Sequence, residues 1–471
     1  MSAKKTLRVG LLGEVEDFDP RRPQEFSALQ VLLQVFETPY SAPLEGRPSA
    51  PQLLAEPLRQ QSSPGGGTVL AAPLLPDVLF SDGTPLTAEQ VVRSYRDCLP
   101  EGASVRARGD EIVLTLERPH ARFQHQLVQA PYAVVLERGG RLLGTGPFAL
   151  DPVASSAREI RLVRNEHYRR EVPLDELVFR VYPPDADGAP TGLLDAIQQG
   201  EVDFCSVLGR EDLAKLGMVR KYILPGASTA FLYFNTERPA FQEVNLRRAL
   251  ALGIDRRELT KVCYANSFAF VATSPLPPFM ERAYDDLDPD ERQARELLAE
   301  IGPPARLRLL RVWGPRPYLP DPVGVTSALE GRCRELGIEL EVTVAKSVED
   351  YFQQIARGDA DLYLSGWAAE TTDPSVYLDA LLSQRWIPRP GRVTGCSNLS
   401  RYASDEMETA LDRYRQGDHP DAAEVIGLVT RDVPFLPIMY GAAVYVHSFD
   451  VRNFAPSPLG WTLLGGVDKS G

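Results

Sequence analysis

The chain has 471 residues, which exceeds the usual size of a single compact domain, so we expect at least two lobes. Aliphatic and aromatic residues make up 44% of it and charged residues 24%, a balance typical of a globular protein with a large buried core. The net charge is -13, from 64 acidic and 51 basic side chains, and this disfavours nucleic acid and anionic membrane surfaces as partners.

The first half of the chain predicts a mixture of strands and helices. Residues 7–12 form an apolar run that indicates a buried strand, and the apolar-rich stretch 28–36 predicts a helix. Thr87 and Gln90 are spaced as a capping box, in which both side chains satisfy backbone amides at the start of a helix. Alternating apolar and polar residues predict half-buried strands at 111–116, 159–163 and 177–182.

The second half carries start and stop signals for helices. Asp288 is the expected N-cap of one helix, with Pro289 in its first turn, and Gly302 ends it. Residues 347–358 have the same start and stop pattern, and the apolar stretch 360–364 directly after them predicts a strand. This alternation of helix and strand favours an α/β lobe.

Motifs with a known catalytic or cofactor-binding mechanism are absent from the sequence. It contains no GxxxxGK[ST] phosphate loop, no HExxH helix, no GxSxG elbow and no CxxC pair. Of the five histidines only His120 and His125 are near neighbours, and a spacing of five does not suit a helical pair of metal ligands. We therefore expect no bound metal, no cofactor and no enzymatic activity.

The cysteines and the N-terminal residues bear on the cellular compartment. Five widely spaced cysteines favour buried, reduced thiols over a disulfide framework; they are Cys98, Cys205, Cys263, Cys333 and Cys396. The N-terminal residues lack the apolar core of a secretory signal peptide, so a cytoplasmic location is expected if the sequence is complete.

Short segments spread over almost the whole chain occur in an order that is characteristic of one protein family. They are 36–38 (FET), 80–88 (FSDGTPLTA), 144–148 (GTGPF), 165–168 (NEHY), 234–236 (FNT), 246–250 (LRRAL) with 254–256 (IDR), 275–278 (PLPP), 294–298 (ARELL), 366–367 (GW), 373–374 (DP) and 398–402 (NLSRY). Together they resemble the extracellular solute-binding proteins of peptide and nickel ABC importers, family 5, which includes the dipeptide- and oligopeptide-binding proteins.

This resemblance implies an α/β, two-lobed periplasmic-binding-protein-like fold of type II with an extra subdomain and a ligand enclosed at the hinge. We expect a discontinuous first lobe formed by 1–262 and 440–471, with an inserted subdomain at about 41–143. The second lobe is expected at 263–439. Hinge closure would then exclude water from the ligand, as binding a charged peptide requires.

A pocket for a zwitterionic peptide needs one acid and one base, because charges taken out of water are costly unless opposite charges meet them. In peptide-binding members of the family, an aspartate three residues after the Gly-Trp tryptophan receives the peptide ammonium. Here that position is Glu370, three residues after Trp367. Arg316 and Tyr318 belong to an Arg-Pro-Tyr segment that looks like the one gripping the ligand carboxylate in dipeptide-binding members.

Each of these assignments has a structural alternative. Glu370 could be a surface loop residue, and Arg316 could be an exposed arginine beside prolines. Trp367 could line the ligand cleft with an apolar face or belong wholly to the core. The backbone around Glu37 resembles the family segment that pairs with an extended peptide as an added strand.

The resemblance implies a solute-binding protein that encloses a short peptide and presents it to an ABC transporter. An ABC permease is the expected partner of an exported chain, the location would be periplasmic or at the cell surface, and the chain would be a monomer. The alternative is an intracellular relative that senses or sequesters a peptide. An enzyme on this scaffold is disfavoured because no nucleophile–base pair is visible.

Overall fold

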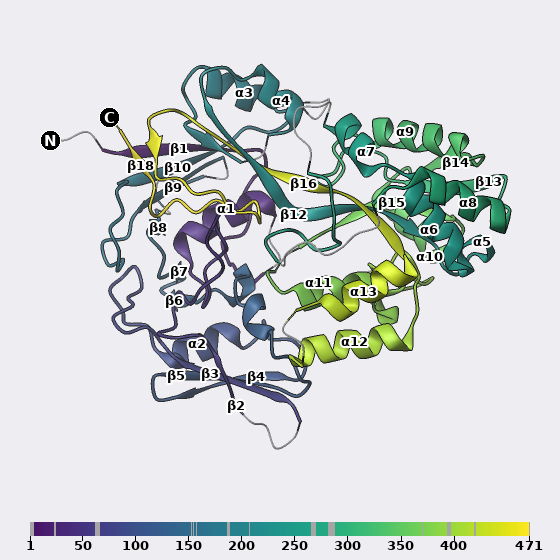
Figure 1. Ribbon diagram of the computed structural model, residues 1–471. Coiled ribbons are helices and arrows are strands. Elements are labelled where there is room, and N and C mark those ends of the chain that lie inside the picture. Colours follow the sequence, from purple (N-terminus) through teal and green to yellow (C-terminus); the bar gives the residue numbers. More distant parts are fainter. Residues whose placement is uncertain are drawn as a thin grey trace. The chain divides into compact units, whose positions relative to one another are not determined.

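The computed structural model describes residues 4–22, 25–61, 66–151, 153, 155–156, 158–185, 189–206, 208–264, 270–280, 288–369, 371–392, 397–418 and 421–470. The chain divides into two compact units (Figure 1). Unit 1 is discontinuous and consists of Met1–Leu224 and Ala443–Gly471, and unit 2 is Pro225–Ala442. Two long strands carry the chain from one unit to the other, β12 (Arg220–Phe234) on the way out and β16 (Phe435–His447) on the way back.

The first boundary of unit 2 differs from the expected one at residue 262. Residues 225–262 pack with unit 2 because α6 (Val244–Gly253) and α7 (Arg256–Cys263) bury apolar side chains in the same core cluster as β13 (Arg306–Arg311). Burial of this shared apolar surface, rather than the end of a family motif, sets the boundary of the unit. The second boundary falls at 442, close to the expected 439.

Unit 1 is built on a mixed sheet around its first strand. The central strand β1 (Thr6–Leu11) is parallel to β10 (Glu176–Val181) and to β11 (Phe204–Cys205). Next to β10 lies β9 (Glu159–Arg164), which is antiparallel to it, and next to β9 lies β8 (Phe148–Leu150), which is antiparallel to β9. Helix α1 (Phe26–Val35) packs on this sheet, and both contribute to one apolar core cluster. Unit 1 also contains the helices α3 (Thr191–Gln198) and α4 (Arg210–Lys215) and the strand pair β17 (Val451–Arg452) and β18 (Asp468–Lys469).

A second, antiparallel sheet in unit 1 falls inside the segment expected to form a subdomain at about 41–143. Its strand order is β2 (Arg59–Gln61), β3 (Thr68–Pro73), β5 (Glu111–Leu116) and β4 (Ala103–Arg108). Helix α2 (Ala88–Tyr95) contacts β4 and β5, and a hairpin of β6 (Leu136–Arg138) and β7 (Arg141–Leu143) follows. That the whole segment is a separate subdomain stays a prediction.

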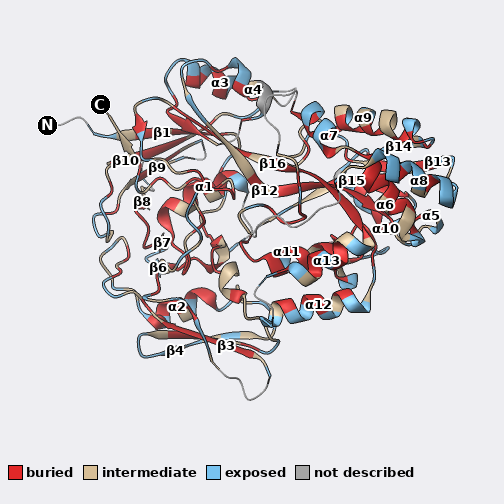
Figure 2. Ribbon diagram, viewed as in Figure 1, coloured by how far each residue is buried: buried red, intermediate tan, exposed pale blue. Residues whose placement is uncertain are grey.

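Unit 2 is a sheet covered by helices on both faces. Strand β13 is parallel to β14 (Glu339–Val344) and to β15 (Leu362–Ala368), and β15 is antiparallel to β12. Alternate residues of β15 enter two core clusters: Leu362 and Leu364 belong to one, and Tyr363 belongs to the other. Figure 2 shows the resulting buried strands beneath helices with exposed outer faces. These helices are α5 (Pro239–Gln242), α6, α7, α8 (Glu291–Ile301), α9 (Pro322–Glu335), α10 (Val348–Arg357), α11 (Pro374–Leu382), α12 (Asp405–Gln416) and α13 (Ala423–Asp432).

Local capping signals are confirmed at two helices and shifted at a third. The Thr87 capping box starts α2, and Ser347 caps α10, which ends at Gly358 in a left-handed conformation. The expected N-cap Asp288 is wrong, because Asp290 caps α8 instead and accepts a hydrogen bond from the Gln293 amide (2.9 Å). Both aspartates satisfy the same capping rule, and the tertiary position of the chain decides between them.

The structure describes four of the five cysteines. Cys98 and Cys333 are free thiols, and Cys396 lies outside the described residues. Burial raises the pKa of Cys98 and of Cys333 to about 11, so both stay protonated at neutral pH. Within the described part of the chain, no helix combines the length and apolar character that a membrane span requires.

A buried histidine in unit 1 lies in an aromatic cluster. The ring of His447 stacks on Phe204 and Tyr222, with Phe454 edge-on to it. Its Nδ1 donates to the Ser448 carbonyl (2.7 Å), and its Nε2 is buried with no hydrogen-bond partner among the described residues. Burial therefore lowers the pKa of His447 below its ordinary value of 6.5.

We expect this histidine to make the protein less stable in mild acid. The unfolded chain takes up a proton on His447 as the pH falls below about 6.5, whereas the folded chain resists it, so the free energy of unfolding decreases. His447→Phe keeps a ring in the cluster and removes the titrating group. Urea unfolding at pH 7.5 and pH 5.0 should show a smaller acid loss in this variant, and an equal loss would contradict the assignment.

Candidate functional site

Three of the five predicted site residues lie at one edge of the unit 2 sheet. Because β13, β14 and β15 are parallel, their carboxyl ends meet at the same edge, which is where open α/β sheets bind ligands. The chain that leaves β13 at this edge contains Arg316 and Tyr318, and Trp367 is the second-last residue of β15.

A tight turn fixes the backbone at Arg316. The Arg316 amide donates to the Leu319 carbonyl (3.0 Å), and the Leu319 amide donates to the Arg316 carbonyl (2.9 Å). Pro317 occupies the second position of this four-residue turn, where its fixed φ is favoured. The residue before a proline is restricted to extended conformations, so Pro317 also limits the backbone of Arg316. Together, the turn and the proline fix the direction in which the Arg316 side chain projects.

Two glycines allow the turn to lie directly on the strands. A Cβ at Gly366 of β15 would come within 2.4 Å of the Tyr318 ring, and a Cβ at Gly441 of β16 would come within 2.6 Å of the Pro317 carbonyl oxygen. Both distances are far below van der Waals contact. The Tyr318 ring therefore packs on the backbone of β15, immediately beside Trp367.

The Arg316 guanidinium is stacked and only half-buried. Its Cζ lies 4.3 Å from the centre of the Trp313 ring, and its Nη1 donates to the Pro315 carbonyl (2.9 Å). Among the described residues, no carboxylate forms an ion pair with Arg316. A guanidinium with a covered face and free N–H edges is suited to bind a planar anion through two parallel hydrogen bonds.

Two tyrosines adjoin this arginine, the partly buried Tyr318 and the buried Tyr351. Burial raises the pKa of Tyr318 and of Tyr351, while the nearby Ser365 hydroxyl and the positive charge of Arg316 act in the opposite direction. Both hydroxyls are therefore neutral at physiological pH and can donate as well as accept hydrogen bonds.

Trp367 was expected either to line the ligand cleft or to belong wholly to the core, and it has features of both. It pairs with Thr229 across β15 and β12, packs against one core cluster of unit 2 and remains partly exposed. The Tyr377 hydroxyl donates to its carbonyl (3.2 Å), which fixes the strand end. Glu370, the expected partner of the ligand ammonium, lies outside the described residues.

Glu37 lies in unit 1 and its carboxylate is held by internal partners. Arg169 donates to both carboxylate oxygens (2.7 and 2.8 Å), and the hydroxyls of Thr145 and Tyr168 donate at 3.0 and 3.2 Å. Burial disfavours the charged guanidinium, but the hydrogen bonds that it donates to Glu37 and the negative charge of Glu37 outweigh this effect and raise the pKa of Arg169. The side chain of Glu37 therefore fixes local structure, and ligand pairing by the backbone around it stays a prediction.

No sequence pattern predicts two residues that complete these arrangements. Trp313 stands three residues before Arg316, but the stacking of the two side chains depends on the turn between them. Arg169 is 132 residues from Glu37, and no local pattern relates such distant charges.

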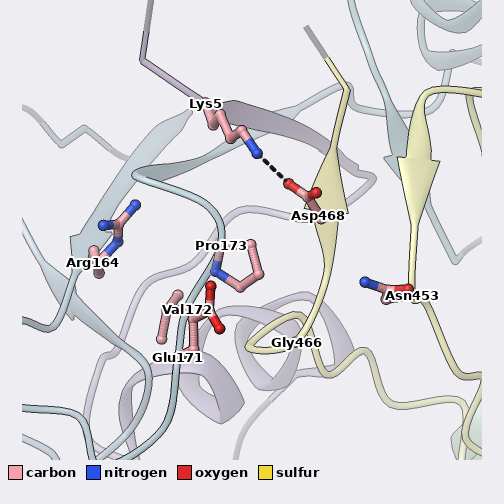
Figure 3. A pocket seen from close by; sticks show the side chains of 8 residues that line it. All are labelled: Lys5, Arg164, Glu171, Val172, Pro173, Asn453, Gly466 and Asp468. Atoms are coloured by element: carbon pink, nitrogen blue, oxygen red, sulfur yellow. Dashed lines mark hydrogen bonds and ion pairs between the residues drawn. The ribbon is translucent and has the colours of Figure 1, made fainter. Parts of the chain in front are cut away.

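A separate hollow of about 560 Å³ lies on unit 1 (Figure 3). Lys5, Arg164, Glu171, Asn453 and Asp468 supply its polar lining. Lys5 is paired with Asp468 at 2.8 Å, as Figure 3 shows, and Arg164 donates to the Leu174 carbonyl at 3.0 Å. Most charged side chains that line this pocket are thus already paired or hydrogen-bonded within the protein. The described residues also contain no group of three or more His, Cys, Asp or Glu side chains placed to hold a metal ion.

Comparison with known proteins assigns the family. The model of the bacterial extracellular solute-binding proteins, family 5 Middle, matches residues 54–388. The peptide transport periplasmic protein SapA of Salmonella typhimurium is 26% identical over 385 residues, and heme-binding protein A of Haemophilus influenzae is 26% identical over 347. These alignments cover 75% and 70% of this chain, and 67% and 60% of the two relatives.

Solved structures show the fold. The structure of HbpA2 from Haemophilus parasuis matches with a TM-score of 0.85 at 20% identity, covering 99% of this chain and 100% of that one. The periplasmic binding protein DppA from Helicobacter pylori, in complex with the peptide STSA, matches with a TM-score of 0.69 at 19% identity, covering 99% and 98%. The predicted mixed α/β, two-lobed periplasmic-binding-protein fold is confirmed, and the chain belongs to family 5 of the bacterial extracellular solute-binding proteins.

Proposed function

We propose that this chain is the solute-binding component of an ABC importer and that its ligand is a short peptide. Membership of the solute-binding family supports the first part. The second part is supported by similarity to a peptide transport protein and by the fold shared with a binding protein that holds a tetrapeptide. On this proposal the chain has no catalytic role of its own.

The observation that carries the peptide proposal is the Arg316 guanidinium at the carboxyl edge of the unit 2 strands. It stacks on Trp313, and no described carboxylate neutralises it. A half-buried cation without a counter-charge forms strong charge-assisted hydrogen bonds with an incoming anion. The planar guanidinium of arginine matches the geometry of a carboxylate. The C-terminal carboxylate of a peptide supplies such a group.

The ligand ammonium is assigned to Glu370 through the family resemblance alone. Glu370→Gln removes the negative charge with little change in size, so a free ammonium would lose its counter-charge. We expect affinity for a peptide with a free N-terminus to fall by roughly 2 to 5 kcal/mol, and affinity for its N-acetylated form to change little. Calorimetry of both peptides with both proteins measures this; equal losses for the two peptides would assign the ammonium to another residue.

The function itself is tested by titrating the protein with one peptide in four forms: free, N-acetylated, C-amidated and blocked at both ends. Recognition of a zwitterion predicts that each block weakens binding and that the double block weakens it most. Binding that is indifferent to both blocks would contradict the proposal. Heme is the competing ligand to include, because the heme-binding relative is as similar in sequence as the peptide transport relative.

The proposed partner is an ABC permease, and the proposed location is the periplasm or the outer cell surface, with the chain acting as a monomer. A gene neighbourhood that contains permease and ATPase genes would support import. The alternative, an intracellular protein that senses or sequesters a peptide, predicts that such genes are missing and that the protein is found in the cytoplasmic fraction.

A further inference from the structure

We propose that Trp313 is a positioning residue for the ligand carboxylate, and that its indole ring holds the Arg316 guanidinium in the orientation that binds this group. This inference rests on the proposed function, because it concerns the same ligand end. It assigns a role to a tryptophan that lies outside the Arg-Pro-Tyr motif and that no sequence motif predicts as a binding residue.

The stacking geometry is the first argument. The Arg316 Cζ lies 4.3 Å from the centre of the Trp313 ring, well inside the distance of about 6 Å at which a guanidinium is attracted to an aromatic face. The ring covers one face of the guanidinium and accepts no conventional hydrogen bond from it. Of the five N–H donors, one is used by the Pro315 carbonyl, and the guanidinium also interacts with the Tyr318 hydroxyl, which leaves other donors for a carboxylate.

The attachment of the two side chains is the second argument. Trp313 lies two residues after the end of β13 and directly follows the buried Val312, so the chain is held close to the sheet at the base of the indole. Arg316 is flanked by Pro315 and Pro317, which restrict the backbone on both sides. Because both backbones are fixed, the ring limits the rotamers of a long side chain that would otherwise lose much entropy on binding.

The exposure of Trp313 is the third argument. Trp313 is 36% exposed, although tryptophan is the largest apolar residue, whereas other aromatic residues of unit 2 are fully buried. A ring that is only partly buried contributes less to the core than its size allows. Its contact with Arg316 accounts for its position at the ligand edge.

The test compares Trp313→Leu with Trp313→Phe. An equimolar library of synthetic tripeptides and the same library with C-terminal amides serve as probes, and the apparent affinity for each is measured. Trp313→Leu should bind the free library about 3- to 30-fold more weakly, as expected for the loss of a desolvated cation–π contact, and the amidated library nearly unchanged. Trp313→Phe, which keeps an aromatic face, should recover part of the loss.

Trp386→Leu is the matched control. Trp386 also lies in unit 2 and also has an arginine over its ring, with the Arg385 Cζ 5.2 Å from the ring centre. It is far from the turn in sequence, and its indole N–H donates to Asp379 (2.7 Å). This variant should keep the wild-type preference for the free library.

Arg316→Ala, measured in parallel, distinguishes the positioning role of Trp313 from the carboxylate site at Arg316. If Arg316→Ala loses the preference for free carboxylates and folded Trp313→Leu keeps it, the role of Trp313 is overturned while the proposed function stands. If Arg316→Ala also keeps the preference, the carboxylate site itself is wrong and the role of Trp313 falls with it. Equal weakening of both libraries by Trp313→Leu would mean that Trp313 only supports the fold.

Discussion

Arg316→Ala should weaken binding of a free short peptide by roughly 2 to 5 kcal/mol, which is about 30-fold to several-thousand-fold in affinity. The reason is that the ligand carboxylate loses its counter-charge while it is still removed from water. The half-buried guanidinium, stacked on Trp313 at 4.3 Å, has no described carboxylate partner that would share this loss. Calorimetry with a matched pair of free and amidated peptides gives the measurement.

Two comparisons make this result specific. The amidated peptide has no carboxylate to lose, so its affinity should fall far less in Arg316→Ala. Arg292→Ala removes an exposed arginine of unit 2 that is paired with Glu296, and it should leave both affinities unchanged. Equal losses for the free and the amidated peptide would mean that Arg316 is structural and that another residue holds the carboxylate.

Arg169→Ala should lower the free energy of unfolding by about 3 to 5 kcal/mol. The substitution leaves the carboxylate of Glu37 buried, with the side chains of this pair only 13% and 4% exposed, and without its positive partner. The hydroxyls of Thr145 and Tyr168 remain, but they cannot neutralise the charge. Urea unfolding monitored by circular dichroism measures the change.

A charge-free double variant and an exposed pair are the controls. Glu37→Gln combined with Arg169→Gln removes both charges and should be less destabilised than Arg169→Ala, because no buried charge is left alone. Arg158→Ala breaks an ion pair with Glu14 whose side chains are 72% and 43% exposed, and should change stability by less than about 1 kcal/mol. A similar small effect for Arg169→Ala would show that the buried pair contributes little.

Local patterns predicted the secondary structure well where the signal was confined to a few neighbouring residues. The capping box at Thr87 and the start and stop signals at Ser347 and Gly358 are of this kind. The cap at Asp290 was missed because two aspartates stand two residues apart, and only tertiary packing selects one. The unit boundary at 224 depends on which core buries α6 and α7, and no local pattern predicts this.

The candidate site was only partly predictable for the same reason. Short motifs predicted Arg316, Tyr318 and Trp367 as ligand-binding residues, and the structure places Tyr318 against the residue next to Trp367. The support of Arg316 by Trp313 depends on a turn closed by two hydrogen bonds, and the binding of Glu37 by Arg169 joins residues that are 132 positions apart. Neither contact follows from residue type or spacing.

Native mass spectrometry after incubation with a ligand mixture tests the central claim most directly. The mixture contains a library of free di- to pentapeptides, heme and a nickel–histidine complex, each in excess over the protein. The account predicts adducts whose masses correspond to short peptides, and their loss when the same peptides carry blocked ends. Adducts of heme or of the nickel complex alone, or an unliganded protein in the presence of the whole library, would contradict it.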